Sequence, residues 1–346
     1  MDEAKAVREH EVLDWENLEI YLRESLPELT GKMMVAQFHG GHANLTYLLR
    51  FGDKELVLRR PPFGVIAPGA HDMKREYRVL SKLHQHFSPA PRAYHLCLDE
   101  EIIGAMFVVM ERRHGVLVRT GLPECFRGTR NVESRLAAAM VKAEADLHII
   151  DVEKAGLTDM GKPEGFVQRQ LAGWARRWEL SETEQNTSMR FLFKKLSEEI
   201  PEPQAVSILH NDLKFDNCQF QPDDPDRVTS IFDWDMSTIG DPLIDFGTTL
   251  AYWPDKKKLG FPKLPTMLRG DFPDKSFLIK KYAEHTGFSM DQVSWYEAFS
   301  YGKTATIAQQ LYKRFVDGDT KDERMAHFGY SAMALSSIAE SIAKEL

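Results

Sequence analysis

Cysteine is scarce in this sequence of 346 residues, whose three cysteines, Cys97, Cys125 and Cys218, are widely spaced and form no CxxC pair. A disulfide framework or a structural zinc site is therefore not expected, and we interpret the cysteines as reduced packing residues. Long apolar runs are missing too, since none approaches the roughly 20 residues that a membrane-spanning helix needs. The sequence also opens without a signal-peptide pattern. These absences favour a globular protein in the cytoplasm.

Positive charge is in deficit, because 44 lysines and arginines face 52 aspartates and glutamates and leave a formal net charge of -8. Nucleic acids and anionic membranes select basic surfaces, so neither is an expected partner. Internal repeats and low-complexity segments are absent as well. With 43% hydrophobic residues, a chain of this length suits about two domains with substantial cores. The sequence gives no indication of oligomeric state.

The most informative stretch of the sequence runs from residue 207 to residue 246. An apolar run ends at His210, Asp212 follows two residues later, and Asn217 lies five residues beyond that. This spacing matches the H-x-D-x-x-x-x-N pattern of a kinase catalytic loop, and a second apolar run then leads to Asp233. Each residue alone is more often part of a buried turn. The spacing, together with Asp233, favours a catalytic site.

Phosphoryl transfer requires these residue types. Its transition state is loose, with charge spread over the phosphoryl oxygens, so positioning and Mg²⁺ matter more than covalent help from the protein. Asp212 is expected to accept or orient the proton of the attacking hydroxyl, while His210 braces the loop. Asn217 and Asp233 supply the amide and carboxylate oxygens that Mg²⁺ prefers.

These motifs resemble the aminoglycoside phosphotransferase and choline kinase superfamily of small-molecule kinases. The resemblance rests on residues 210–217, on Ile-Phe-Asp-Trp-Asp at 231–235 and on Gly-Asp-Pro-Leu-Ile-Asp at 240–245. It is closest to the branch similar to the kinase-like domain fused to some acyl-CoA dehydrogenases. That branch usually has glycine at the position of Asn211. The asparagine of this chain is instead what choline and ethanolamine kinases have there. The resemblance also implies that Asp245 tethers the catalytic loop through hydrogen bonds.

The predicted elements suit a two-lobed α+β fold of the protein-kinase-like type. We expect a small antiparallel β lobe with an opening helix in residues 1–112, which binds nucleotide, and a larger helical lobe for catalysis and substrate in residues 113–346. Strands are predicted at 33–38, 45–51, 55–60, 93–98 and 102–110, and helices at 14–26, 72–87, 132–149, 164–178, 277–282, 290–315 and 325–346. A capping box at 181–184 predicts one more helix, which Pro201 ends.

A glycine pair, Gly40 and Gly41, separates the first two predicted strands. Kinases place a glycine-rich loop over the ATP phosphates at this point, because residues without a Cβ let backbone N–H groups approach the phosphate. A simple hairpin is the commoner meaning of Gly-Gly, and the complete G-x-G-x-x-G pattern is absent. The resemblance assigns the loop to the nucleotide, with Asn44 near its end.

Arg59 occupies the position of the lysine that kinases use to hold the α- and β-phosphates. Val57 and Arg59 share one face of the third strand, whereas Arg60 would be an edge charge. Glu76 on the following helix is the expected partner of Arg59. Arginine binds phosphate in a bidentate manner and stays charged, so it can take the role of the lysine. Glu111 is placed at the hinge, whose backbone is expected to contact the adenine.

The acceptor site is less defined by the sequence. Asp235 is a candidate for a second ion or a polar substrate, and the resemblance points to Trp253, Gln309 and Arg314 as residues of the acceptor cleft. Acidic residues would suit an aminoglycoside, and the basic residues Lys256, Lys257, Lys258 and Arg269 would suit an anionic or CoA-linked hydroxy acid. A choline-like acceptor would need an aromatic cage, for which Tyr252 and Trp253 are weak candidates.

We expect a Mg²⁺-dependent kinase that transfers the γ-phosphate of ATP to a hydroxyl group of a small molecule. GTP remains an open alternative as donor. A nucleotide-binding pseudokinase without turnover is a second hypothesis, which Arg59 in place of lysine keeps open. A metal-dependent hydrolase that uses His210 and Asp212 is a third, and it would require more histidines near the metal than this stretch provides.

Overall fold

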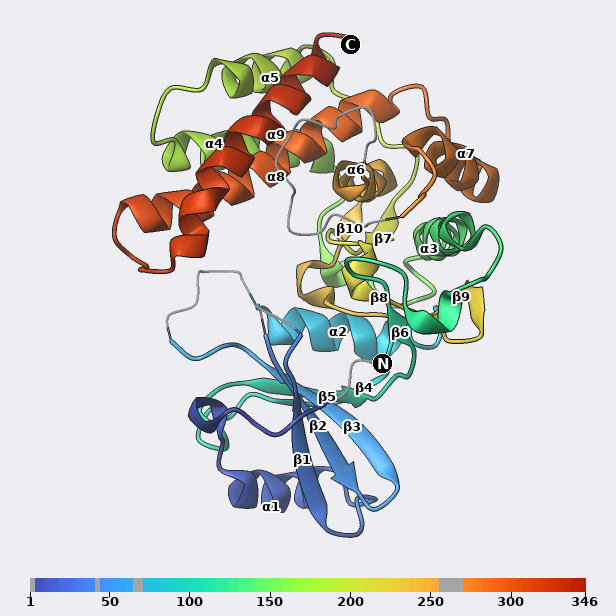
Figure 1. Cartoon of the computed structure of the whole chain (residues 1–346), viewed down its shortest axis with the longest axis vertical. Helices are drawn as coiled ribbons and strands as arrows, with labels where there is room; N and C mark the ends of the chain where they lie inside the picture. The colour runs from blue at the N-terminus through green and yellow to red at the C-terminus, as the bar shows by residue number, and fades with distance from the viewer. Residues whose placement is uncertain (1–3, 41–43, 65–70, 255–269) are drawn as a thin grey trace.

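The fold has a small lobe built on one sheet and a larger lobe built mainly of helices (Figure 1). The computed structural model describes residues 4–40, 44–64, 71–254 and 270–346. The α+β class and the arrangement of a small antiparallel β lobe beside a larger helical lobe, both predicted from the sequence, are confirmed. Within the described residues, no helix is both long and apolar enough to cross a membrane.

The small lobe contains a five-stranded antiparallel sheet in the order β1-β2-β3-β5-β4. The strands are β1 Met33–Phe38, β2 Leu45–Phe51, β3 Lys54–Arg60, β4 Ala93–Cys97 and β5 Phe107–Glu111. The last strand begins five residues later than predicted, because residues 101–105 form a turn and bend. The helices α1 Trp15–Ser25 and α2 Met73–Leu83 lie on opposite sides of the sheet (Figure 1).

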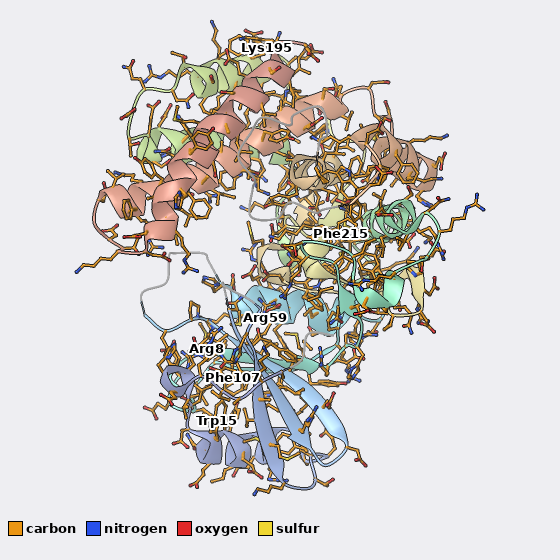
Figure 2. All side chains as sticks on the ribbon, in the orientation of Figure 1. Arg8, Trp15, Arg59, Phe107, Lys195 and Phe215 are labelled. Carbon is orange, nitrogen blue, oxygen red and sulfur yellow. The ribbon has the colours of Figure 1, made fainter. Side chains whose placement is uncertain are left out.

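Side chains alternate along β3, so neighbouring residues pack against different parts of the protein. Leu56 and Leu58 pack in the core with α1, whereas Val57 belongs to the core cluster that contains α2 and the larger lobe. Because side chains alternate along a strand, Arg59 shares the face of Val57. Figure 2 shows Arg59 on the side of the sheet that faces the larger lobe. The sequence-based choice of Arg59 over Arg60 therefore agrees with the packing.

The larger lobe surrounds two short sheets with helices. The helices are α3 Val132–His148, α4 Phe166–Ser181, α5 Thr187–Glu198, α6 Pro242–Tyr252, α7 Lys275–Thr286, α8 Val293–Val316 and α9 His327–Ala343. One sheet pairs β7 Ser207–Leu209 with β10 Thr238–Gly240, and the other joins β6 Val116–Leu117, β8 Cys218–Gln221 and β9 Asp224–Ile231. Helix α6 contacts α8 closely at Gly247, where a Cβ would lie 2.7 Å from the carbonyl oxygen of Tyr296.

The predicted capping box at residues 181–184 is wrong. Ser181 is the last residue of α4, and its hydroxyl donates to the carbonyl of Arg177 within that helix. Helix α5 begins instead at Thr187, where Asn186 caps it by accepting a hydrogen bond from the Met189 N–H. The local pattern of Ser and Glu is correct for a cap, but the apolar face of α4 continues to Trp178 and keeps the chain helical through Ser181.

Candidate active site

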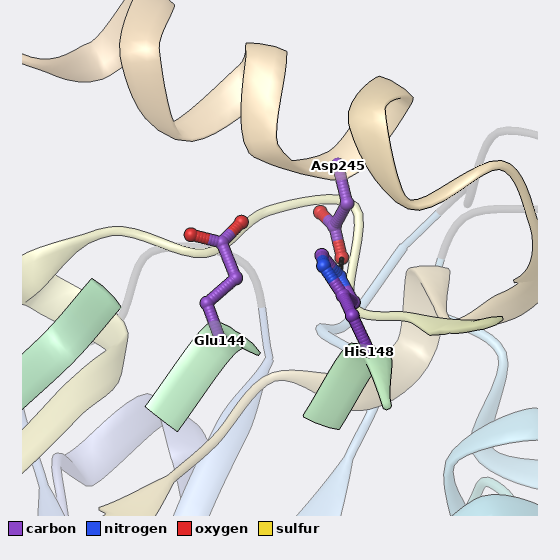
Figure 3. Close-up of side chains that lie close together, drawn as sticks. All are labelled: Glu144, His148 and Asp245. Atoms are coloured by element: carbon purple, nitrogen blue, oxygen red, sulfur yellow. Dashed lines mark hydrogen bonds and ion pairs between the residues drawn. The ribbon is translucent and has the colours of Figure 1, made fainter. Parts of the chain in front are cut away.

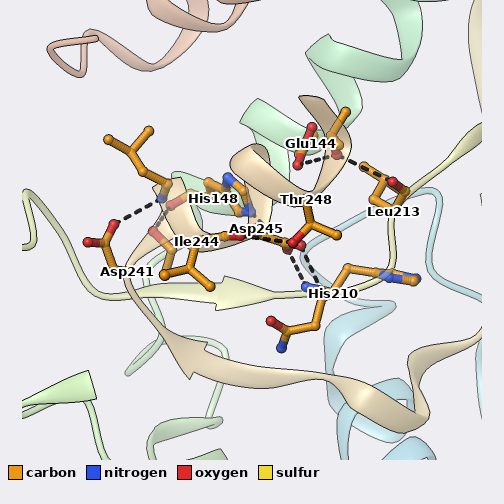
Figure 4. Close-up of polar contacts among 12 residues, drawn as sticks. Glu144, His148, His210, Leu213, Asp241, Ile244, Asp245 and Thr248 are labelled. Atoms are coloured by element: carbon orange, nitrogen blue, oxygen red, sulfur yellow. Dashed lines mark hydrogen bonds and ion pairs between the residues drawn. The ribbon is translucent and has the colours of Figure 1, made fainter. Parts of the chain in front are cut away.

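The catalytic loop begins where β7 ends and is held by hydrogen bonds to α6. Asp245 on that helix accepts hydrogen bonds from the backbone N–H groups of His210, at 2.5 Å, and Asn211, at 2.8 Å (Figure 4). Burial opposes the charge of this carboxylate, but His148 and the loop N–H groups hold the pKa of Asp245 below its usual value. The tether expected from the resemblance is thus present as a contact.

Glu144 and His148 on α3 meet Asp245 on α6, with one ligand atom of each lying within 4.8 Å of the others (Figure 3). His148 is already engaged, because its Nε2 lies 3.2 Å from Asp245 and its Nδ1 lies 2.6 Å from the hydroxyl of Tyr282. Burial and the nearby Asp245 raise the pKa of Glu144 strongly, which favours its neutral form. Because Asp245 bonds both to His148 and to the backbone of the catalytic loop, the cluster serves to support the loop.

His210 braces the loop with both ring nitrogens. Its Nε2 lies 2.8 Å from the carbonyl oxygen of Phe232, and its Nδ1 accepts from the N–H of Asp212 at 3.2 Å. The ring also packs against Trp234, with a centroid separation of 4.7 Å. Since both nitrogens have backbone partners, His210 is not placed to bind a metal or to act as a base. This geometry disfavours the hydrolase hypothesis.

Asn211 has a left-handed backbone with a φ of 67°. Its side-chain amide also donates to the carbonyl oxygen of Met236, which links the catalytic loop to the segment after Asp233. We expect Asn211→Ala to be less stable than Asn211→Gly by about 1 kcal/mol, because both lose the amide but only alanine is strained in this conformation. Urea unfolding of the two variants measures the difference. Equal stabilities would contradict the assigned strain.

Three side chains surround the carboxylate of Asp212. Lys214 donates to Oδ2 at 2.6 Å and the Asn217 amide donates to the same oxygen at 3.1 Å, while the hydroxyl of Tyr252 donates to Oδ1 at 2.9 Å. The Asn217 amide nitrogen also donates to the Asp212 carbonyl at 2.8 Å, so its amide oxygen is the atom left for a metal. The sequence analysis did not single out Lys214, although it lies only two residues after Asp212.

Tyr252 orients one oxygen of Asp212. Burial and the neighbouring carboxylate raise the pKa of Tyr252 far above its usual value, so the phenol remains a donor. We expect Tyr252→Phe to lower the kcat of phosphoryl transfer about 5- to 10-fold, which corresponds to the loss of one hydrogen bond of roughly 1 kcal/mol. Tyr312→Phe on α8 is the matched control. A Tyr252→Phe variant with unchanged kcat would remove Tyr252 from this role.

Asp233 and Arg59 connect the two lobes. Arg59 donates from Nη2 to Asp233 at 2.7 Å and from Nη1 to Glu76 at 2.5 Å, while its own side chain is only 9% exposed. Burial raises the pKa of Glu76 to about 7 even beside the guanidinium. Burial also opposes ionisation of Asp233, but there Arg59 prevails and lowers the pKa. Arg59 thus has the expected helix partner and binds the predicted metal ligand as well.

The loop between β1 and β2 lies close to other candidate residues. The Asn44 amide nitrogen is 3.4 Å from an Asp235 carboxylate oxygen. Gly40 contacts the guanidinium of Arg119 so closely that a Cβ would collide with it, and only glycine fits without a shift of Arg119. Gly41, the other half of the predicted pair, lies outside the described residues.

A backbone hydrogen bond joins the catalytic loop to the segment that carries Asp233. The N–H of Phe232 donates to the carbonyl oxygen of Asn217 at 3.0 Å. A family model described as the phosphotransferase enzyme family matches residues 35–262, which include Arg59, the catalytic loop and Asp233. The chain belongs to this family.

Similar proteins extend the phosphotransferase match over almost the whole chain. Acyl-CoA dehydrogenase family member 10 of Mus musculus is 29% identical over 97% of this chain, and family member 11 of Gallus gallus is 30% identical over 98%. The matched segments make up 32% and 45% of those two relatives, so the chain spans less than half of their length. Both relatives belong to the predicted branch.

Solved structures agree with the phosphotransferase fold. A Ralstonia eutropha protein assigned as an aminoglycoside phosphotransferase is 31% identical, with a TM-score of 0.80 over 96% of this chain and 99% of its own. Choline kinase from Cryptosporidium parvum has a TM-score of 0.63 at 14% identity, covering 96% of both chains. A thermostable aminoglycoside phosphotransferase bound to ADP and hygromycin B has a TM-score of 0.58 at 16% identity, over 95% of this chain and 98% of its own. The last two likenesses concern the fold alone.

Two of the residues predicted to line the acceptor cleft, Trp253 and Gln309, have buried side chains. Trp253 is 4% exposed, packs against Phe215 and Phe272, and donates from its indole to the carbonyl of Pro273. Gln309 is 6% exposed and donates to the carbonyl oxygen of Ser181 at the end of α4. Both side chains are thus used in packing and helix termination, and their contact with an acceptor remains a prediction.

The remaining predicted residues have mixed positions. Glu111 ends β5, where its N–H donates to the Arg92 carbonyl and its carboxylate accepts from the Arg92 N–H, so the structure ties it into the sheet. Arg314 is exposed near the end of α8, and its contact with an acceptor remains a prediction. The basic residues proposed for an anionic acceptor, at 256–258 and 269, lie outside the described residues.

Proposed function

We propose that this chain is a small-molecule kinase that transfers the γ-phosphoryl group of ATP to a hydroxyl group. The observation that carries the proposal is the pair of hydrogen bonds that joins Asn217 to Asp212 and to the segment of Asp233. Asn217 bonds to Asp212 through its side chain, and its backbone carbonyl bonds to the residue before Asp233. Such an arrangement brings a base and two oxygen ligands to one place, as in-line transfer requires.

The donor set suits magnesium. Asp233 offers the carboxylate oxygen that Arg59 does not hold, and Asn217 offers its amide oxygen. Mg²⁺ binds protein through one or two such hard oxygen ligands and keeps its other positions for water and phosphate. When bound, the ion would neutralise charge on the phosphates. Softer metals would call for histidine or cysteine, and the ring of His210 is engaged with the backbone.

Asp212 then acts on the acceptor hydroxyl. The carboxylate takes up the proton of the attacking oxygen, while Lys214 and Tyr252 fix its direction. Arg59 already binds two carboxylates, so its contact with phosphate would require it to give up Asp233 in favour of the nucleotide. Mg²⁺ bound to the Asp233 carboxylate would then replace the positive charge of the Arg59 guanidinium.

The proposal assigns the acceptor only to a class, small molecules with a hydroxyl group. An aromatic cage for choline loses support, because Trp253 is buried and the Tyr252 ring lies under the Lys214 ammonium at 5.2 Å. The relatives named as acyl-CoA dehydrogenase family members make hydroxyacyl-CoAs the first compounds to test. Sugars, aminoglycosides and choline complete the panel.

ATP consumption with Mg²⁺ across this panel tests the proposed function. We expect one class of hydroxyl compound to stimulate ATP turnover and to yield a phosphorylated product by mass spectrometry. Calorimetric ATP binding without turnover on any acceptor would favour the pseudokinase. Zinc-dependent cleavage of a substrate without nucleotide would favour the hydrolase.

A further inference from the structure

Lys303 is a buried lysine in the middle of α8. Its residue is only 4% exposed, yet its Nζ reaches the catalytic loop and donates to the carbonyl oxygen of Asn211 at 3.0 Å. A second contact joins Nζ to the hydroxyl of Thr248 on α6 at 3.4 Å. A charged group is costly to bury, so a lysine in this position needs specific partners. The shorter of its two contacts is with the carbonyl oxygen of Asn211, the residue before Asp212.

The carbonyl bound by Lys303 belongs to the peptide group between Asn211 and Asp212. The other groups of Asn211 are also held, since its N–H donates to Asp245 and its side chain donates to the Met236 carbonyl. A left-handed residue requires such support on several sides, because its neighbours must fix an unfavourable conformation. Lys303 provides the only one of these supports that comes from α8.

We propose that Lys303 is a positioning residue for phosphoryl transfer. By fixing the peptide that leads into Asp212, it sets the direction of the carboxylate toward the acceptor hydroxyl and links the C-terminal helices to the catalytic loop. This inference rests on the proposed kinase function. It assigns no contact between Lys303 and a substrate, since the residue is buried and its ammonium group bonds to Asn211 and Thr248.

Kinetics of Lys303→Met separate positioning from general stability. Methionine keeps the apolar stem but cannot donate, so we expect kcat to fall about 10- to 100-fold while the Kd for Mg·ATP changes less than about twofold. The matched control is Lys313→Met, which removes a half-exposed lysine of the same helix that pairs with Asp317. The control is expected to retain wild-type kcat. An unchanged kcat in Lys303→Met, or equal losses of kcat and ATP binding, would overturn the proposal.

Lys303→Gln covers the case in which the methionine variant does not fold. Its amide retains a donor on a shorter side chain, so an intermediate kcat with a near-normal Tm is expected. A glutamine variant whose kcat and Mg·ATP affinity fall equally would overturn the proposal in the same way.

Amide hydrogen exchange tests the contact of Lys303 with the catalytic loop without depending on kinase activity. If the wild type phosphorylates no compound in the panel, the kinase assignment fails, but the loop contact can still be measured. Peptides that cover residues 207–217 should exchange faster in Lys303→Met, or in Lys303→Gln, than in the wild type or in Lys313→Met. Equal exchange in all of them would show that Lys303 does not hold the loop.

Discussion

Arg59→Met is expected to lower the free energy of unfolding by about 3–5 kcal/mol, the usual cost of removing one partner of a buried ion pair. Arg59 is the shared partner of Glu76, which is fully buried, and of Asp233. Without the guanidinium, both carboxyl groups must either bear an uncompensated charge or take up a proton. Urea unfolding monitored by tryptophan fluorescence measures the loss, and nucleotide binding should fall with it.

The size of this effect should depend on pH. Because burial raises the pKa of Glu76 to about 7, this residue is mostly neutral in the folded wild type below that pH and ionised above it. The raised pKa means that the wild type loses stability as pH increases from the unfolded value toward 7. In Arg59→Met the pKa of Glu76 rises further, so the variant continues to lose stability above pH 7. The difference between variant and wild type should therefore be larger at pH 8 than at pH 6.

Arg50→Met is the matched control on the neighbouring strand. Arg50 pairs with Glu55 at 2.7 Å, but the side chains are 49% and 25% exposed. Surface pairs of this kind contribute about 0–1 kcal/mol. If the two arginine variants lose equal stability, or if Arg59→Met loses less than about 1 kcal/mol, Arg59 is not the buried connection between the lobes.

Asp212→Ala is expected to lower kcat by about 10²- to 10⁴-fold, the usual contribution of a positioned general base. Binding of Mg·ATP should remain largely intact, because the proposed metal ligands are Asn217 and Asp233. Single-turnover transfer to the best acceptor of the panel measures the first quantity, and calorimetry measures the second. Asp223→Ala, which removes an exposed carboxylate from the turn after β8, is the control and should behave as the wild type. Near-normal turnover of Asp212→Ala would remove Asp212 from its role.

Local patterns were sufficient to predict the elements that carry this site. Period-two alternation in β3 separates Arg59 from Arg60, and the spacing within the loop places Asn217 beside Asp212. Both depend on residues only a few positions apart, so the chain geometry fixes them before tertiary packing does. Asp245 is different, because it lies 35 residues from the His210 N–H that it accepts from, and only the family resemblance predicted this tether.

Contacts between distant segments could not be predicted in this way. Lys303 lies 92 residues from its partner Asn211, and Gln309 lies 128 residues from the helix end that it binds. Neither side chain has a local pattern that distinguishes a buried donor from a solvated one. The packing of Trp253 could not be predicted for a related reason, because an aromatic residue near the site suits a ligand cage and a core equally well until its neighbours are known.

A crystal structure of the chain with Mg²⁺ and a non-hydrolysable ATP analogue tests the central claim most directly. The account predicts a metal ion at about 2.0–2.1 Å from the Asn217 amide oxygen and an Asp233 carboxylate oxygen, the normal range for Mg²⁺. The γ-phosphate should face Asp212, with Gly40 over the phosphates. A nucleotide bound elsewhere, or a metal held without Asn217 and Asp233, would contradict the proposed function.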